Sequence, residues 1–150
     1  MLKGEYRYGT DNLSEAFNIR KTVFGKEFNF LEEELFDDFE LDSIHVLIYY
    51  KDIAIGTGRL YYSGESYKIG RIAVLKEYRK NGIGEFLVNM LIDKALLLGA
   101  DEVIVHSQER AVDFYKKLGF HTIDNIPFKE FNIPHIKMIY YKKNNNKCKS

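Results

Sequence analysis

The sequence predicts a mixed α/β (α+β) fold, with a central sheet flanked by helices. Three segments rich in β-branched and aromatic residues follow one another between residues 45 and 74. Helical periodicity begins at residue 82, and helical and apolar strand-like segments then alternate as far as residue 141. A meander of strands followed by strand, helix, strand, helix and strand is typical of one mixed sheet covered by helices.

The first element expected along the chain is an amphipathic helix. Its inward face is formed by residues at helical spacing (Leu13, Ala16, Phe17 and 20–24), and Asp11 or Asn12 precedes it as a cap. An acidic segment follows between residues 30 and 43, with no basic residue and with seven carboxylates (Glu32, Glu33, Glu34, Asp37, Asp38, Glu40 and Asp42).

The middle of the chain predicts a hairpin and a third strand. Residues 45–50 (HVLIYY) and 53–62 (IAIGTGRLYY) flank a Lys51-Asp52 turn, which is the pattern of a β-hairpin. Residues 67–74 (YKIGRIAV) then read as the third strand after a polar turn.

The second half predicts two helices between strands. Apolar residues from Ile83 to Leu98 recur on one helical face, and Gly99 supplies a C-terminal stop. Residues 102–107 (EVIVHS) form a short, continuously apolar strand, as expected for one buried on both faces. Between residues 111 and 118 the apolar and aromatic residues recur at helical spacing, which predicts a short helix. Residues 135–141 (HIKMIYY) are expected to form the last strand.

Length and composition indicate one globular domain. The 150 residues contain no internal repeat and no proline-rich linker, so we expect a single domain over residues 1–143 and a disordered polar tail over residues 144–150. The 22 basic and 22 acidic residues cancel, which disfavours nucleic acid as a partner. The single cysteine, Cys148, allows neither an intramolecular disulfide nor a thiolate metal cluster, so we expect a cytoplasmic protein without a metal. The first residues lack the apolar region of a signal peptide, and no apolar stretch reaches the roughly 20 residues needed to span a membrane. We therefore expect neither export by a standard signal nor insertion into a membrane.

The sharpest motif is RKNGIG, residues 79–84, between the third strand and the long helix. Two glycines before a free helix N-terminus let several backbone N–H groups converge on one anion, which the helix dipole also favours. The motif therefore indicates a pyrophosphate site, although a plain strand-to-helix turn would also use these glycines. A dinucleotide fingerprint would need Gly or Ala at Leu87, and a P-loop would need Gly-Lys-Ser/Thr, which is absent.

The order of motifs resembles a known family. Strand IGRIAV, loop RKNGIG, a long helix, strand VIVHSQ and a helix ending in FYKKLGF resemble the cofactor-binding core of the GNAT N-acetyltransferase superfamily over residues 67–123. The segments 19–30, 107–120 and 128–138, with His45, also resemble the small bacterial group typified by YjcF and ElaA. The resemblance implies a GNAT-type, mostly antiparallel sheet and an acetyl-CoA-dependent N-acetyltransferase.

The same resemblance implies roles for individual residues. The pyrophosphate of acetyl-CoA would be held by the loop residues Arg79, Lys80, Gly82, Ile83 and Gly84. The main chain of Ile72, Ala73 and Val74 would pair with the pantetheine arm as an added strand. Tyr115 would lie beside the thioester sulfur as general acid, whereas outside the family context it reads as a core aromatic.

The general base is left open by the sequence. An alkyl amine has a pKa of about 10.4, so a base must take its proton before it attacks. The third strand carries Arg71 and no carboxylate, so His45, His106, His135, Glu27 and Glu33 are all candidates. His135 is preferred because it lies beside a loop expected near the acceptor.

The acceptor is also left open. The acidic segment is either the solvated side of a helix whose Leu31, Leu35 and Phe39 pack inward, or part of an acceptor mouth that attracts a cationic amine. The basic residues (Arg20, Arg59 and Arg71) instead favour an acceptor with a carboxylate or phosphate.

Three functions from different classes fit the sequence. The leading one transfers acetyl to a primary amine of a small molecule or to a protein lysine or N-terminus. A non-catalytic acyl-CoA sensor is favoured only by the missing carboxylate on the third strand, and a plain interaction domain is the weakest. The oligomeric state is open, with a homodimer as one option.

Overall fold

The computed structural model describes residues 1–9 and 11–143, so the expected tail and Cys148 lie outside the described residues. The chain runs through β1 (Leu2–Tyr8), α1 (Ser14–Arg20), η1 (Lys21–Glu27), α2 (Glu32–Leu35), β2 (Ile44–Tyr50), β3 (Ile53–Tyr62), β4 (Tyr67–Val74), η2 (Lys76–Tyr78), α3 (Ile83–Leu97), β5 (Glu102–Gln108), η3 (Glu109–Ala111), α4 (Val112–Lys117), β6 (His121–Thr122), β7 (Phe128–Glu130) and β8 (Ile133–Tyr141). These elements confirm the predicted mixed fold.

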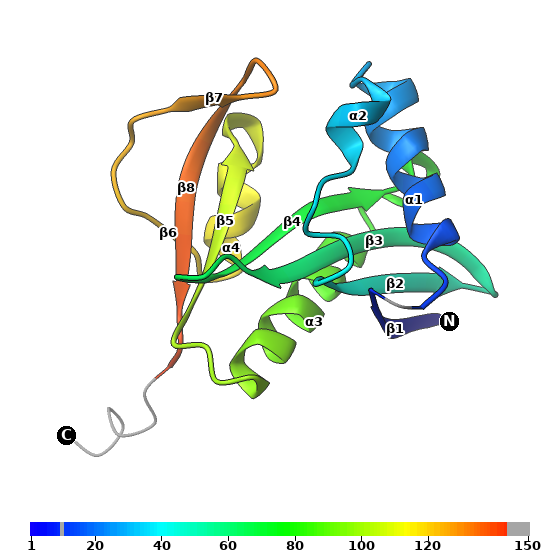
Figure 1. Ribbon diagram of the computed structural model, residues 1–150, viewed down its shortest axis with the longest axis horizontal. Coiled ribbons are helices and arrows are strands. Elements are labelled where there is room, and N and C mark those ends of the chain that lie inside the picture. The colour runs from blue at the N-terminus through cyan, green and yellow to red at the C-terminus, as the bar shows by residue number, and fades with distance from the viewer. Residues whose placement is uncertain (10, 144–150) are drawn as a thin grey trace.

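One sheet carries all the described strands, in the order β1-β2-β3-β4-β5-β8-β6, with β7 paired to β8. Strands β1 to β4 form an antiparallel meander, and β4 and β5 are the parallel pair. Figure 1 shows α3 on one side of the meander and α1 and α2 on the other. The sheet is therefore mostly antiparallel and is covered by helices on both faces.

Two apolar layers hold the helices on the sheet. The larger one joins the buried face of α3 (Leu87, Val88, Leu91 and Ala95) to residues of β2, β3 and β5. The smaller one joins Ala16, Ile19 and Val23 to the opposite face of β2 and β4. Burial of such side chains contributes about 1.5–3 kcal/mol each, so both helices are fixed by their apolar stripes.

The N-terminal helix differs in two details from the sequence expectation. Neither Asp11 nor Asn12 is the N-cap, because Leu13 holds that position; Asn12 Oδ1 instead accepts the N–H of Ser14 at 3.0 Å. The helix then continues as the π-helical stretch η1 as far as Glu27.

Strand β1, which the sequence reading did not predict, pairs with β2 along its whole length.

The acidic segment is not one amphipathic helix. Only residues Glu32–Leu35 are helical, and turns follow. Leu35 is buried as expected, but Leu31 is 59% exposed and Phe39 is 40% exposed. The inward-packing explanation is therefore wrong for two of its three residues, because a single helical turn cannot maintain a helical stripe.

The feature that creates space in the sheet is the divergence of β4 from β5. Their parallel pairing covers only Tyr67–Ile69 of β4 opposite Val103–Val105 of β5. Beyond that point β5 pairs with β8 and β4 pairs with β3, so each strand keeps one unpaired edge among the described residues. In Figure 1, β5 and β8 rise steeply away from β3 and β4.

A β-bulge in β4 accompanies this divergence. Thr57 is opposite Ala73, but Arg59 is opposite Gly70, so β4 contains an extra residue between these pairs. Arg71 has a φ of +52° there. Because one extra residue reverses which side chains face each side of a sheet, the bulge places Arg71 on the α1 and α2 face, the face opposite to Ile69.

Candidate functional site

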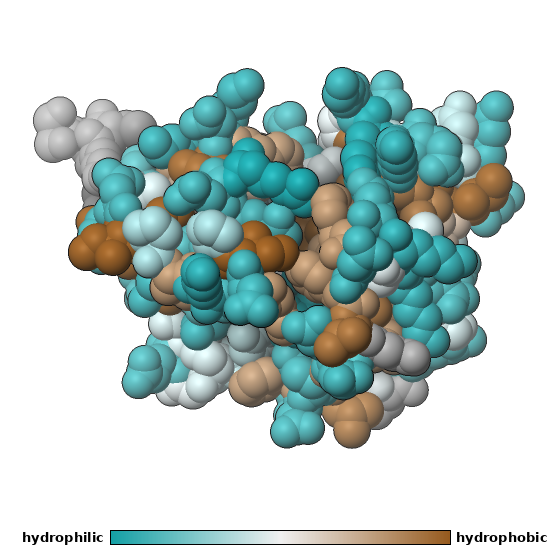
Figure 2. All heavy atoms as spheres, turned by 90° about the horizontal axis from the view of Figure 1, so that it is seen from above, coloured by the Kyte–Doolittle hydropathy of each residue, from teal (hydrophilic) through white to brown (hydrophobic). Residues whose placement is uncertain are grey.

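A cavity of about 840 Å³ occupies the space where β4 and β5 diverge. It extends from the N-terminus of α3, past the unpaired edge of β4, to α2 and the β7–β8 turn. Figure 2, which views the molecule from above, shows apolar atoms in the middle of the face between hydrophilic rims. Every cofactor-binding residue expected from the sequence lines this cavity (Ile72, Ala73, Val74, Arg79, Lys80, Gly82, Ile83 and Gly84).

The loop before α3 has the backbone of an anion site. Lys80 and Gly82 both take positive φ values, +69° and +77°, which turn successive N–H groups toward one side. No side chain caps α3, and its first helical hydrogen bond is Phe86 N–H to Gly82 O at 3.0 Å. The N–H groups of Ile83 and Gly84 therefore have no intrahelical acceptor and are available to an anion.

The side chain of Arg79 is already engaged. Its Nε donates to Val74 O at 2.9 Å, and its two terminal nitrogens donate to the carboxylate of Glu27 at 2.5 and 2.7 Å. These hydrogen bonds lower the pKa of Glu27. Arg79 thus ties η1 to the loop, and only Lys80 brings an unpaired charged side chain from this loop to the cavity within the described residues.

The edge of β4 offers alternate backbone groups to the cavity. Leu75 N–H donates to Ile55 O of β3 at 2.8 Å. Because successive residues of an antiparallel strand point their backbone groups to opposite edges, Ile72 and Val74 direct theirs toward the cavity, and Ala73 directs its own toward β3. An extended amide-containing ligand could pair with the N–H and C=O of Ile72 and with the N–H of Val74, whose carbonyl already accepts from Arg79.

Tyr115 is both a core aromatic and a residue that lines the cavity. Its ring is buried and contacts Phe114 and Phe120 edge-on, with centroids 5.0 and 5.4 Å away. It also lines the cavity, and its hydroxyl has no hydrogen-bond partner among the described residues. Burial raises the pKa of Tyr115, so the hydroxyl keeps its proton at neutral pH.

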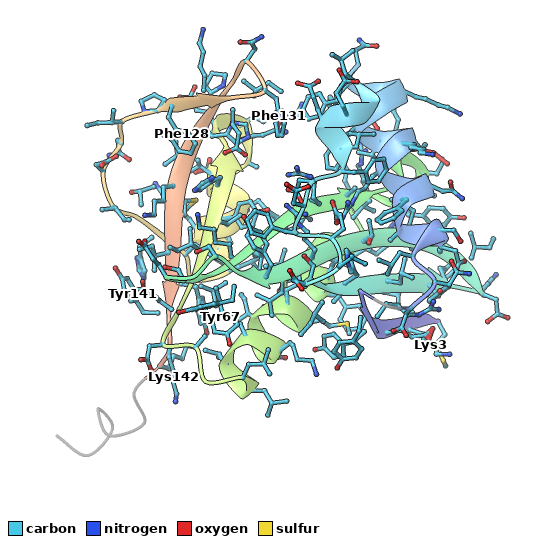
Figure 3. The ribbon with its side chains drawn as sticks, viewed as in Figure 1. Lys3, Tyr67, Phe128, Phe131, Tyr141 and Lys142 are labelled. Atoms are coloured by element: carbon cyan, nitrogen blue, oxygen red, sulfur yellow. The ribbon has the colours of Figure 1, made fainter. Side chains whose placement is uncertain are left out.

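Two histidines face the cavity from the β5 and β8 side. His106 Nδ1 lies 3.0 Å from Glu130 Oε2, and this hydrogen bond lowers the pKa of Glu130. His135 Nδ1 donates to Ile133 O at 2.7 Å. In both residues Nδ1 carries the proton in the neutral form, which leaves the Nε2 lone pair as a proton acceptor. Figure 3 shows Phe128 on β7, and its ring packs between the two histidines.

The other base candidates are placed less suitably. His45 is buried, its Nε2 contacts Glu40 O at 3.1 Å, and it does not line the cavity. Glu33 is exposed and also lies outside the cavity lining. Glu27 lines the cavity but is paired with Arg79. The structure therefore brings only His106 and His135 of the five candidates to the cavity with a free acceptor atom.

The acidic segment and the arginines, which the sequence presented as opposing signals, are paired at two carboxylates, Asp37 and Glu40. Arg59 donates to both oxygens of Asp37 at 2.6 Å. Arg20, which is fully buried, donates to Glu40 Oε2 at 2.8 Å, and Arg59 lies 3.1 Å from the same oxygen. These two carboxylates of the acidic segment therefore support the fold, whereas Glu34 of the same segment lines the cavity.

Several cavity residues escaped the sequence reading. Glu130, Phe131, Lys68 and Arg110 all line the cavity. Figure 3 shows Phe131 at the β7–β8 turn, on the side toward α2, and its ring lies 5.4 Å from that of Phe30. The signal available for Glu130 was its proximity to His135 in the sequence, because residues on either side of a tight turn lie side by side on paired strands.

No described helix is both long enough and apolar enough to cross a membrane. No group of three or more His, Cys, Asp or Glu side chains in the described part of the chain is arranged to hold a metal ion.

Comparisons with known proteins agree with this geometry. The family described as acetyltransferase (GNAT) domain matches residues 13–142. The uncharacterized N-acetyltransferase YjcF of Bacillus subtilis is 36% identical over 138 residues, which cover 92% of this chain and 99% of that protein. Escherichia coli ElaA superimposes with a TM-score of 0.84 at 23% identity, covering 93% of this chain and 99% of that one.

A GNAT family acetyltransferase from Elizabethkingia anophelis, solved with acetyl-CoA bound, has a TM-score of 0.69 at 19% identity, with coverage of 94% and 98%. The similarities to this structure and to ElaA show a shared fold. The family match and the identity to YjcF show similarity in the sequence itself. The resemblance seen in the sequence is confirmed, and the chain belongs to the GNAT family of N-acetyltransferases.

Proposed function

We propose that the protein transfers the acetyl group of acetyl-CoA to a primary amine of a small molecule or of a protein. The observation that carries this proposal is the single cavity that joins the α3 N-terminus, the unpaired edge of β4 and Tyr115. The acetyl-CoA in the related E. anophelis structure supports the same donor. A sequence with a single cysteine, which can form no intramolecular disulfide, supports a reducing, cytoplasmic location.

Each part of the cavity suits one part of the donor. The N–H groups of Ile83 and Gly84, with Lys80, would hold the pyrophosphate, and Gly82 gives the loop its left-handed turn. Arg79 would act through its bonds to Val74 and Glu27, which fix the loop beside β4. Ile72 and Val74 would pair with the pantetheine amides, while Ala73 stays bonded to β3. Bound acetyl-CoA supplies an acetyl group activated as a thioester.

The chain's own groups then move two protons. His135 Nε2 would take a proton from the ammonium form of the acceptor, so that the neutral nitrogen can form the new C–N bond at the acetyl carbon. The N–H of Val74, or of a neighbouring β4 residue that is not paired with the pantetheine arm, would donate to the oxyanion that develops on that carbon. As the C–S bond breaks, Tyr115 would donate its proton to the leaving sulfur and regain one from the nitrogen of the tetrahedral intermediate, which leaves the neutral amide and free thiol.

His106 is the second candidate for the base. Its Nδ1 is paired with the carboxylate of Glu130, which fixes the orientation of the ring and leaves Nε2 as the proton acceptor. His135 has only a backbone carbonyl as its partner. Substitution of each histidine in turn therefore distinguishes the two candidates.

The test of the proposed function has two parts. Calorimetric titration with acetyl-CoA should give saturable binding, and release of free thiol should then depend on an added amine from a panel of amino acids, polyamines, aminosugars and lysine peptides. Binding without thiol release for any amine would favour an acyl-CoA sensor, which the absence of a carboxylate on β4 also favours. No binding would contradict the proposal.

A further inference from the structure

The far end of the cavity, beyond the expected thioester, carries basic side chains from β3 and β4. Arg59, Lys68 and Arg71 all line it. Lys68 precedes Ile69, which packs against the α3 core, so Lys68 projects to the opposite face, where α1 and α2 lie. The bulge brings Arg71 to that same face. Three cations therefore meet on one wall.

The carboxylates near this wall are largely occupied. Asp37 accepts two bonds from Arg59 at 2.6 Å. Glu34 Oε1 accepts the N–H of Leu31 at 2.8 Å, and Glu130 is bonded to His106 at 3.0 Å. Glu40 is shared by Arg20 and Arg59, at 2.8 and 3.1 Å.

Arg71 is left with long contacts. Its Nε lies 3.3 Å from Leu35 O, and its NH2 group lies 3.5 Å from Glu34 O and 3.4 Å from Asp37. Its side chain is only 16% exposed. Burial and the repulsion from Arg59 together lower the pKa of Arg71, which indicates a cation short of compensating charge.

Lys68 has no ion-pair partner at all within the part of the chain that the structure describes, and Arg59 Nε is buried there without a hydrogen-bond acceptor. A buried or half-buried cation without a partner costs free energy, and an anionic ligand would remove that cost.

The proton acceptors of the opposite wall lie close by. The Arg71 guanidinium lies 5.4 Å from the centre of the Phe131 ring, and Glu130, the residue before Phe131, is bonded to His106. Arg71, His106 and His135 all line the same cavity, and His106, His135 and Arg71 all lower the pKa of Glu130. One small molecule in this space can therefore lie between the arginine and the histidines.

We propose that Arg71 and Lys68 bind the carboxylate of an amino-acid-type acceptor, whose neighbouring amine faces His106 and His135. This inference rests on the proposed function and narrows its substrate class to small amines that carry a carboxylate near the amino group. The side chain of an internal lysine in a protein lacks that carboxylate, and a polyamine would be repelled by the same two cations.

The first experiment compares acceptors that differ only at the carboxylate. Thiol release from acetyl-CoA is measured with each common L-amino acid, its carboxamide, its decarboxylated amine and its aminophosphonate analogue. For the preferred side chain, we expect kcat/KM for the amino acid to exceed that for the amide and the amine at least tenfold, since a charge-assisted pair is lost.

The second experiment removes each cation in turn. Lys68→Gln and Arg71→Gln should each raise KM for the amino acid at least tenfold, with kcat little changed and the values for the amide unaltered. Lys68 makes no described contact that its loss would break, so this variant keeps the test valid if Arg71→Gln destabilises α2. Lys137→Gln, an exposed lysine on β8 outside the cavity lining, is the matched charge control and should behave as wild type.

The outcomes separate this inference from the proposed function. If amides or decarboxylated amines are acetylated as fast as the acids, or if both variants keep the preference for acids, the carboxylate site is overturned while the acetyltransferase assignment stands. A tenfold preference for the aminophosphonate over the amino acid would also overturn it. If no amine is acetylated, both proposals fail together.

Discussion

The two ends of the cavity are lined by different kinds of chemical group, backbone groups at one end and side chains at the other. At the α3 end the ligand-facing groups are backbone N–H groups of Ile83 and Gly84 and of the β4 edge, positioned by local conformation. At the α2 end they are side chains that come from distant parts of the chain, such as Arg71, His106 and Glu130. In the function proposed above, the main chain would therefore bind the acetyl donor and side chains would select the acceptor.

The largest effect is expected where the two ends meet, at Tyr115. Tyr115→Phe keeps the buried ring and removes only the hydroxyl, so turnover should fall about 100-fold with little change in acetyl-CoA affinity. The measurement is kcat from thiol release under conditions in which chemistry limits the rate, together with calorimetric affinity. A variant as fast as wild type would return Tyr115 to a purely structural role.

The role of the α3 end of the cavity can be tested with a matched pair of glycine variants. Gly82 and Gly64 both have positive φ, +77° and +99°, and a Cβ at either position meets no atom within 4 Å. Both valine variants should therefore strain the chain similarly. Only Gly82→Val should weaken acetyl-CoA binding, by at least tenfold or about 1.4 kcal/mol, because only this loop lies at the cavity.

Calorimetry with acetyl-CoA measures this difference, and thermal unfolding of each variant provides the stability control. Equal affinities for the two folded valine variants would remove the loop from the donor site.

At the α2 end of the cavity, a comparison of the two histidines can decide which one is the general base. If His135 is the base, kcat/KM should rise with pH through one ionisation, and His135→Gln should abolish that ionisation while His106→Gln preserves it. The reverse pattern would assign the base to His106, with Glu130 as its positioning partner.

The pH–rate profiles of both variants, measured with acetyl-CoA affinity as a control, decide between these patterns. Retention of the ionisation in both folded variants would exclude the two residues and leave the amine itself as its source.

The smallest effect is expected in the ion pairs behind the acceptor wall. Burial opposes ionisation of Asp37, but the hydrogen bonds from Arg59 outweigh it and lower the pKa of Asp37 to about 2, from 3.8. A lowered carboxyl pKa contributes stability that is present above pH 4 and is lost as the pH falls from about 4 to 2.

Asp37→Asn should therefore lower the free energy of unfolding by about 1 kcal/mol at pH 7, less than the full shift implies because the carboxylate is partly solvated. The loss should shrink toward pH 2, as urea unfolding at several pH values will measure. Asp38→Asn, at the exposed neighbouring carboxylate, is the control. A loss for Asp37→Asn that does not depend on pH would contradict this account of the pair.

The same contrast explains what could be predicted from the sequence. The turn at Gly82 and the long helix after it are local, so glycine placement and apolar spacing were enough to predict them. Strand β1 was missed although Lys3, Glu5 and Arg7 alternate with Gly4 and Tyr6, because its polar composition masks the strand pattern at a sheet edge. The expected positions of Asp11 or Asn12 as the helix cap and of Leu31 and Phe39 in the core failed, because they depended on exact helix limits.

The acceptor end was out of reach for a physical reason. The Arg59–Asp37 and His106–Glu130 pairs join residues 22 and 24 positions apart, and no local pattern encodes such contacts. Arg71 reaches α2 only because a bulge reverses the face of β4, and a strand pattern read with a strict period of two places it on the wrong side. Composition therefore indicated the charges but not their partners.

Amide hydrogen exchange with and without acetyl-CoA can test whether the main chain binds the acetyl donor, because it reports on individual backbone N–H groups. The account predicts slower exchange at Ile83, Gly84 and Val74 when acetyl-CoA is present, with no change at Ala73, whose group already bonds to β3. Saturating acetyl-CoA that leaves these three amides unprotected would contradict a donor site built from the main chain.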